Sequence, residues 1–177
     1  MRITLRVAGH LDFSKYEYEL ILNTSGSNLT PEVGRNRTRW DAYSASLNTS
    51  GGHRPYAEVT QYVPSRDPNT PPQQVRLITN AAQLQFDPDA KGFRSAFSIT
   101  FARSILEANS LKVTNRWHFN ATALRARGLV DSLGGCGTCY KSPTLDVNST
   151  FNLNIRGSST TAPPDARIES IQIENRS

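Results

Sequence analysis

The chain has 177 residues, of which 37% are hydrophobic and 20% are charged. A chain of this length buries about 70% of the surface that its unfolded form exposes, so it needs neither a metal nor a disulfide to fold as one domain. No apolar run approaches the ~20 residues of a membrane-spanning helix, so we expect no membrane span. The net charge of +5 comes from sixteen arginines and four lysines against fifteen acidic residues, a composition that suits interfaces and contacts with anions.

The chain alternates polar and apolar residues over most of its length. The first such stretch, residues 2–7, has the sequence Arg-Ile-Thr-Leu-Arg-Val. Successive side chains of a strand point to opposite faces, so this pattern predicts sheets with one buried face and one exposed face. In chain order we expect strands near residues 2–7, 16–20, 40–47, 56–63, 74–79, 83–86, 93–101, 111–119, 145–155 and 167–174.

Turn-forming residues separate these stretches, as in the segments 48–52 and 64–72. Proline lacks a ladder donor, and glycine and asparagine accept positive φ, so such clusters predict breaks between strands. Helical patterning is restricted to one turn near 103–109 and a weak stretch at 122–133 that Gly128 interrupts. We therefore expect an all-β, antiparallel two-sheet β-sandwich of jelly-roll or immunoglobulin-like topology, with at most one or two short helical turns.

The C-terminal part of the chain differs from the rest. We expect residues 1–177 to form a single domain in which 157–166, rich in Gly, Ser, Thr and Pro, is a linker to a last strand at 167–174. A strand on such a linker either folds back on its own sheet or adds to the edge of a neighbouring subunit. For the second alternative, the candidate subunit contacts are the apolar residues of the strand, Ile168, Ile171 and Ile173.

Seven asparagines begin an Asn-X-Ser/Thr triplet, which is more than chance predicts for this composition. In an exported chain of a glycosylating organism, such triplets are glycan acceptors on surface turns. The alternative is that β-turns favour asparagine, serine and threonine for their own sake. The candidate glycosylation sites are Asn23, Asn28, Asn36, Asn48, Asn120, Asn148 and Asn175.

The two cysteines, Cys136 and Cys139, lie in a glycine-rich stretch. Nothing around them predicts the strand and helix that flank a redox dithiol, and the three histidines are too scattered to complete a zinc site. We expect a short structural disulfide. The alternatives are two free thiols, or a zinc ion shared across an interface.

Arg35, Arg37 and Arg39 form the densest basic cluster, beside Trp40. Arginine interleaved with aromatic residues is one way to hold phosphates or stack bases. A solvated loop explains the same residues, because Glu32 and Asp41 lie close by in sequence. The cluster is therefore the first candidate contact for an anion or a nucleic acid, if the protein binds one.

No catalytic motif is present: the sequence has no Gly-x-Ser-x-Gly, no His-Glu-x-x-His and no glycine-rich loop that opens a helix. We therefore expect no enzymatic activity, no metal and no cofactor. The aromatic residues either pack in the core or line a sugar-binding face. The set concerned is Trp40, Tyr43, Tyr56, Tyr62 and Trp117.

These features favour a non-catalytic structural subunit of an extracellular or cell-surface assembly, such as a filament, sheath or adhesive layer. It would associate with itself through edge strands and loops. The alternative is a virion structural protein, a coat or decoration subunit, which accounts for a Met1 that leads straight into a strand with no signal-like segment. Nucleic acid is an expected partner only in that case. A second alternative is a carbohydrate-binding module, with glycans as partners.

Overall fold

The computed structural model describes residues 1–26, 45–50, 56–63, 70–71, 73–78, 84–88, 94–110, 113–126, 128–133, 144–146, 153–157 and 160–174. Within these ranges lie twelve strands and one 3-10 helix. The strands are β1 (Arg2–Val7), β2 (Glu17–Asn23), β3 (Ala45–Ser50), β4 (Tyr56–Val63), β5 (Gln73–Ile78), β6 (Leu84–Pro88), β7 (Arg94–Thr100), β8 (Arg116–Arg125), β9 (Gly128–Ser132), β10 (Thr144–Asp146), β11 (Leu153–Arg156) and β12 (Ile168–Glu174), and the helix is η3 (Arg103–Ser110).

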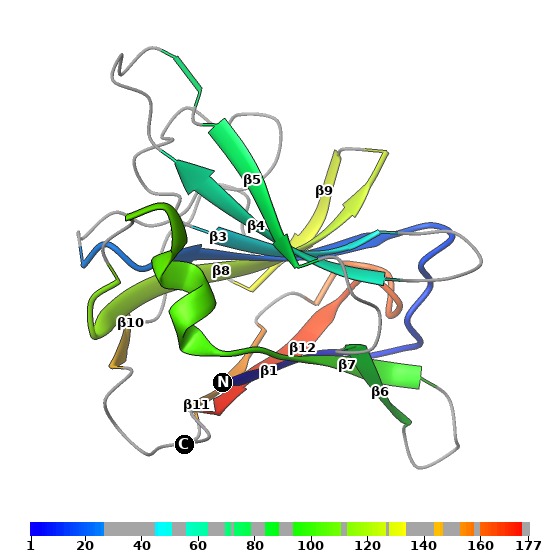
Figure 1. Cartoon of the computed structure of the whole chain (residues 1–177). Coiled ribbons are helices and arrows are strands. Elements are labelled where there is room, and N and C mark those ends of the chain that lie inside the picture. Colours follow the sequence, from blue (N-terminus) through cyan, green and yellow to red (C-terminus); the bar gives the residue numbers. More distant parts are fainter. Residues whose placement is uncertain are drawn as a thin grey trace.

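The described strands form two sheets, which lie one above the other in Figure 1. The lower sheet has five strands in the order β11-β12-β1-β7-β6. The upper sheet has seven strands, in the order β10-β8-β2-β3-β4-β5 with β9 also paired to β8. All of these pairs are antiparallel. The expected all-β class, with antiparallel sheets and almost no helix, is confirmed.

The first strand shows how the alternating sequence builds the core. Ile3, Leu5 and Val7 are buried, whereas the polar residues between them are half-buried. β1 lies inside its sheet, between β12 and β7. Apolar side chains of the seven-stranded sheet, among them Tyr18 and Trp117, belong to the same buried cluster. One core cluster therefore includes residues of both sheets.

The helix η3 is bonded to the seven-stranded sheet. Gln61 of β4 is completely buried, and its Nε2 donates a hydrogen bond of 3.2 Å to the carbonyl oxygen of Leu106. Leu106 itself is buried in the core cluster. Because η3 follows β7 closely in the chain, this bond connects the end of the five-stranded sheet to the other sheet.

Two stretches differ from what the sequence pattern predicts. The prediction of a weak helix at 122–133 is wrong. These residues include the end of β8, a turn and β9, and Thr122 is paired with Ser132. Glycine is a poor helix former, and Gly128 is here the first residue of β9, which pairs with β8. The alternation at 145–155 is divided between β10, which pairs with β8, and β11, which pairs with β12 in the other sheet.

Backbone hydrogen bonds hold the segment before β12 against β12 and the turn after β1. Gly157 N donates to the carbonyl oxygen of Glu169 at 2.9 Å. Gly9 N donates to the carbonyl oxygen of Pro164 at 2.9 Å, and Ala8 N to that of Arg167 at 3.0 Å. In the part of this segment that the structure describes, the chain is thus held against the turn that follows β1, not extended away from it.

Candidate interaction surfaces

The C-terminal strand folds back on its own sheet. β12 is paired with β1 on one side and with β11 on the other. Ile168, Ile171 and Ile173, the candidate subunit contacts, are at most 2% exposed and belong to the core cluster. They are therefore not available to a neighbouring subunit in this fold, and the first of the two alternatives for this strand is the observed one.

A further bond ties β12 to the other sheet. Asp131 of β9 is buried, and its Oδ2 accepts a hydrogen bond of 2.7 Å from the backbone N of Ile168. A buried carboxylate is stable only with such partners. Removal of β12 would leave this carboxylate without its partner and expose the central strand of a sheet, so the strand belongs to the fold.

Edge strands are the places where another chain can add to a sheet. Among the described strands, those with a neighbour on one side only differ in how well they suit this. β10 and β11 have three and four residues. β6 ends in Pro88, where its pairing is irregular, and β9 begins at Gly128 and pairs irregularly with β8. Short length, proline and bulges all weaken an edge as a template.

β5 is longer than these edges, and its pairing with β4 is in regular register from Gln73 to Arg76, with one irregularity before Ile78. It has six residues, Gln-Gln-Val-Arg-Leu-Ile, with neither proline nor glycine. It ends the described order of the seven-stranded sheet, with β4 as its paired neighbour. Gln73 and Gln74 are exposed and Val75 is half-buried. Among the described edges, β5 is therefore the one best suited to pair with a further strand.

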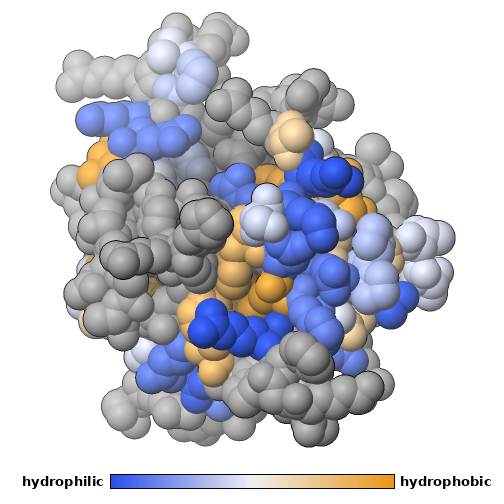
Figure 2. Space-filling view, turned by 90° about the vertical axis from the view of Figure 1, so that its right-hand side faces the viewer, coloured by the Kyte–Doolittle hydropathy of each residue, from blue (hydrophilic) through white to orange (hydrophobic). Residues whose placement is uncertain are grey.

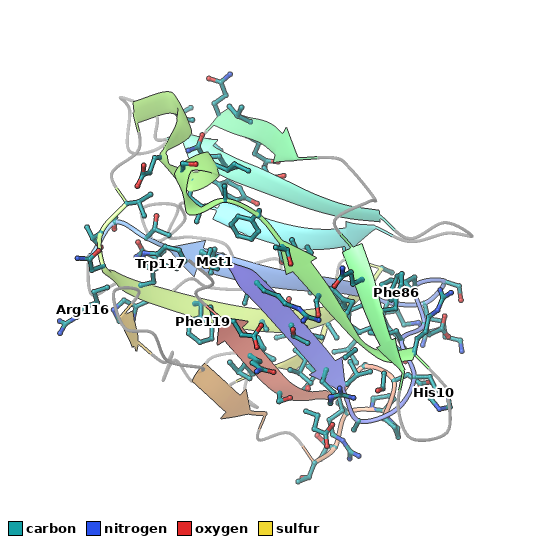
Figure 3. The ribbon with its side chains drawn as sticks, turned by 60° about the horizontal axis from the view of Figure 1, so that its bottom comes forward. Met1, His10, Phe86, Arg116, Trp117 and Phe119 are labelled. Carbon is teal, nitrogen blue, oxygen red and sulfur yellow. The ribbon has the colours of Figure 1, made fainter. Side chains whose placement is uncertain are left out.

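The five-stranded sheet has a polar face opposite the core. Arg2, Thr4 and Arg6 project from it, because the intervening residues of β1 are buried. The same face contains Gln172, which is paired with Thr4, and Ser170, which is paired with Arg6. Figure 3 brings this sheet to the front, with β1 between β12 and β7. It offers guanidinium, hydroxyl and amide groups side by side.

Hydrogen bonds hold the side chains of this polar face in place. Arg6 Nη1 donates to Ser95 Oγ at 2.7 Å, and Arg2 Nη2 donates to Ser98 Oγ at 3.0 Å. The hydroxyls of Thr4 and Ser98 share a hydrogen bond of 2.9 Å. Both serines are buried. The arginines are thus bonded to buried hydroxyls, which orders their guanidinium groups.

The seven-stranded sheet is buried on both faces at β2 and β8. On the face opposite the core cluster, Glu19 is paired with Thr122 and Asn23 with His118. Thr122 Oγ1 and both ring nitrogens of His118 are buried without a hydrogen-bond partner. Burial lowers the pKa of His118, and the positive charge of Arg116 lowers it further. The neutral imidazole is therefore favoured.

The turn after β1 lies against an aromatic group at one end of the sheets. The ring of Phe13 is 5.6 Å from that of Tyr18 and 5.7 Å from that of Phe86, measured between centroids. The guanidinium of Arg94 lies 4.7 Å above the Phe86 ring. Figure 3 places Phe86 and His10 on this side of the molecule. Figure 2 faces it and shows apolar residues in the middle, with hydrophilic ones to the right of them and below.

Two of the candidate glycosylation sites are buried. Asn23 is 1% exposed, and its Oδ1 accepts hydrogen bonds from the N and Oγ of Ser25. Asn120 is 7% exposed, and its Oδ1 accepts from Ala121 N. A glycan needs free space at the amide nitrogen, so this burial argues against both as acceptors in the folded chain. Asn48 lies in β3, opposite Glu19 and Glu58.

The other predicted sites lie outside the described residues. They are the disulfide candidates Cys136 and Cys139, the basic cluster Arg35, Arg37 and Arg39, and the glycosylation candidates Asn28, Asn36, Asn148 and Asn175. Trp40 and Tyr43 of the aromatic set lie outside them too. Trp117 and Tyr62 are buried, so these two do not line an exposed sugar-binding face.

In the part of the chain that the structure describes, no group of three or more His, Cys, Asp or Glu residues is placed to hold a metal ion. Within the same residues, no helix is long and apolar enough to cross a membrane. Comparison of the chain with protein-family models, with curated proteins and with solved structures finds no match.

Proposed function

We propose that this protein is a non-catalytic structural subunit of an extracellular or cell-surface assembly, and that it associates with copies of itself through the edge of its seven-stranded sheet. The observation that carries the proposal is the contrast between β5 and the other described edges. The other four have three to five residues, and one of them ends in proline, whereas β5 has six residues without proline or glycine, exposed glutamines at its start and a regular register with β4 from Gln73 to Arg76.

The C-terminal strand has no part in this association. Its apolar side chains stabilise the subunit itself, because they are buried in the core cluster. Self-association through β5 would use main-chain hydrogen bonds, which need no particular side chain on the partner strand. In an open filament, β5 of one subunit would pair with a different strand of the next subunit, because a two-fold β5–β5 pair closes as a dimer.

Proline substitutions at two adjacent positions test this interface. Neighbouring residues of a strand point their N–H groups to opposite sides. Of Gln73→Pro and Gln74→Pro, one therefore removes an N–H that faces β4 and the other an N–H on the free edge. We expect one variant to keep its thermal stability but to lose assembly, as measured by light scattering after size-exclusion chromatography.

Gln73→Ala and Gln74→Ala are the matched controls, since they shorten the same side chains but keep both N–H groups. Both alanine variants should assemble as the unmodified chain does. Normal assembly of both proline variants would contradict an interface at β5.

We further propose that the two sheets form a sandwich of jelly-roll or immunoglobulin-like topology. Two observations support a facing arrangement: the core cluster draws on both sheets, and Asp131 of the seven-stranded sheet bonds to the backbone of β12 in the other. An experimental structure of the purified chain tests the arrangement, because aligned sandwiches keep their sheets about 10 Å apart.

A virion coat or decoration subunit is the second candidate. The positive net charge of the sequence supports it, and a surface that binds nucleic acid would be the expected consequence. Co-purification with nucleic acid, lost at high salt and on substitution of Arg35, Arg37 and Arg39, would favour this candidate. A carbohydrate-binding module is the third, and retention on a polysaccharide column by the isolated monomer would favour it.

A further inference from the structure

We propose that the polar face of the five-stranded sheet, centred on Arg6, binds an acidic polysaccharide whose sugar units carry carboxylates. This face is distinct from the β5 edge, which belongs to the other sheet. The proposal therefore goes beyond self-association and does not depend on it. It names what the assembled or single subunit would adhere to.

The charge of Arg6 is held without an acidic partner. Its guanidinium is half-buried and donates one hydrogen bond, to Ser95 Oγ at 2.7 Å. Among the described residues, Arg6 is in no ion pair. Arginine has five N–H donors in a planar fork that fits a carboxylate with two parallel bonds. The Arg6 guanidinium is ordered by one hydroxyl and has further N–H donors, which can bind a carboxylate.

Small residues flank Arg6 in the sheet. Its two cross-strand neighbours are Ala96 on β7 and Ser170 on β12, both with small side chains. The register places Arg156 on the far side of Ser170 and Asp87 on the far side of Ala96. The guanidinium therefore lies next to small residues, with a second arginine position one strand further on.

The neighbouring groups suit sugar hydroxyls. Two residues along β1 from Arg6, Thr4 lies between Ser98 and Gln172, and both Thr4 and Gln172 are partly accessible. Hydroxyl and amide groups donate and accept hydrogen bonds, as sugar hydroxyls do. One unpaired cation beside a row of such groups matches a polymer with a carboxylate on each sugar unit and hydroxyls around it.

A nucleic acid fits this face less well. Binding of a phosphate backbone relies on several cations, and here Glu174 is the register partner of Arg2, which leaves Arg6 as the cation of β1 with no acidic residue opposite it on β12. Unspecific single-strand binding also uses aromatic rings as stacking platforms. The residues described on the outward positions of β1 and β12 are Arg2, Thr4, Arg6, Ser170, Gln172 and Glu174, which include no aromatic ring.

Binding to immobilised polygalacturonate tests the proposal, with dextran as the uncharged control and single-stranded DNA as the competing polyanion. The purified chain should bind polygalacturonate in a salt-sensitive manner and bind dextran far more weakly. Arg6→Gln should weaken binding about tenfold or more, because it removes a charge-assisted bidentate contact. The matched control is Arg125→Gln, an exposed arginine of the other sheet with the same loss of charge.

A second pair keeps the test decisive if Arg6→Gln loses stability. Gln172→Glu places a carboxylate on the proposed surface and should weaken binding several-fold, whereas Asn115→Asp adds the same charge at an exposed position before β8. Equal losses in both members of each pair would show attraction by net charge alone. That result, tighter binding to DNA than to polygalacturonate, or no binding to polygalacturonate would each overturn the proposal.

Discussion

The hydroxyl of Tyr18 donates a hydrogen bond of 2.7 Å to the carbonyl oxygen of Asp165. The same hydroxyl accepts a bond of 3.1 Å from the backbone N of Asp12. Tyr18 is fully buried, and this burial raises the pKa of its hydroxyl well above the usual range. One phenol of β2 thus joins the turn after β1 to the segment that leads into β12, two parts of the chain far apart in sequence.

We predict that Tyr18→Phe lowers the free energy of unfolding by about 1–3 kcal/mol, because it leaves two partly buried backbone groups, Asp12 N and the Asp165 carbonyl oxygen, without their partner. Tyr16→Phe is the control, since Tyr16 is also buried but packs through its ring. Chemical denaturation monitored by tryptophan fluorescence provides both values. Equal effects of the two substitutions would show that the hydroxyl of Tyr18 has no special role.

Gly157 lies where the chain approaches β12 closely. A Cβ at this position would overlap the carbonyl oxygen of Ile168. We expect Gly157→Ala to lower the free energy of unfolding by about 2 kcal/mol or more, because backbone must move to make room. Gly128→Ala should cost less, since its nearest neighbour would be the Arg125 carbonyl oxygen at 3.3 Å. Thermal unfolding of the two variants compares them, and the opposite order would contradict the observed path of this segment.

Asp12, in the turn after β1, should make the free energy of unfolding depend on pH in the acidic range. Hydrogen bonds from Lys15 and Ser14 lower the pKa of Asp12 from 3.8 to about 2. A carboxyl with a lowered pKa in the folded chain stabilises it above the unfolded value, and this contribution is lost as pH falls from about 4 towards 2. Asp12→Asn should therefore be less stable than the unmodified chain at neutral pH, with a difference that shrinks over this interval. A difference that stays constant down to pH 2 would refute the interaction.

His118 should make the free energy of unfolding depend on pH in a higher range than Asp12 does. Its pKa is lowered below the ordinary 6.5 by burial and by Arg116. The unfolded chain therefore takes up a proton more readily than the folded chain, and stability falls as pH drops below about 6.5. His118→Gln should reduce the loss of stability between pH 7 and pH 5. Denaturation curves at both pH values test this. If the His118→Gln variant loses as much stability between pH 7 and pH 5 as the unmodified chain, His118 is not the cause of that loss.

The period of two in the sequence predicted the all-β class and the buried side of β1. Ile3, Leu5 and Val7 are buried as that pattern requires. It failed at β2, where Glu19, Ile21 and Asn23 are buried on the second face as well. Alternation indicates which residues share a face, but whether that face is covered depends on contacts that are distant in the sequence.

The partners of the last strand were not predictable either. The same sequence of β12 suits an internal strand or one that adds to a neighbour, and composition of the preceding segment does not distinguish them. What decides is the long-range bonding of Gly9 to Pro164 and of Asp131 to Ile168. The bond of Arg6 to Ser95 was not predictable for a related reason, because it joins residues that are 89 positions apart.

The most direct test of the central claim is electron microscopy of the purified full chain and of the two proline variants, at the same concentration. The proposal predicts regular filaments or layers for the unmodified chain, and dispersed single subunits for whichever of Gln73→Pro and Gln74→Pro blocks the free edge of β5. Dispersed monomers of the unmodified chain at every concentration, or identical assemblies from all three proteins, would contradict it.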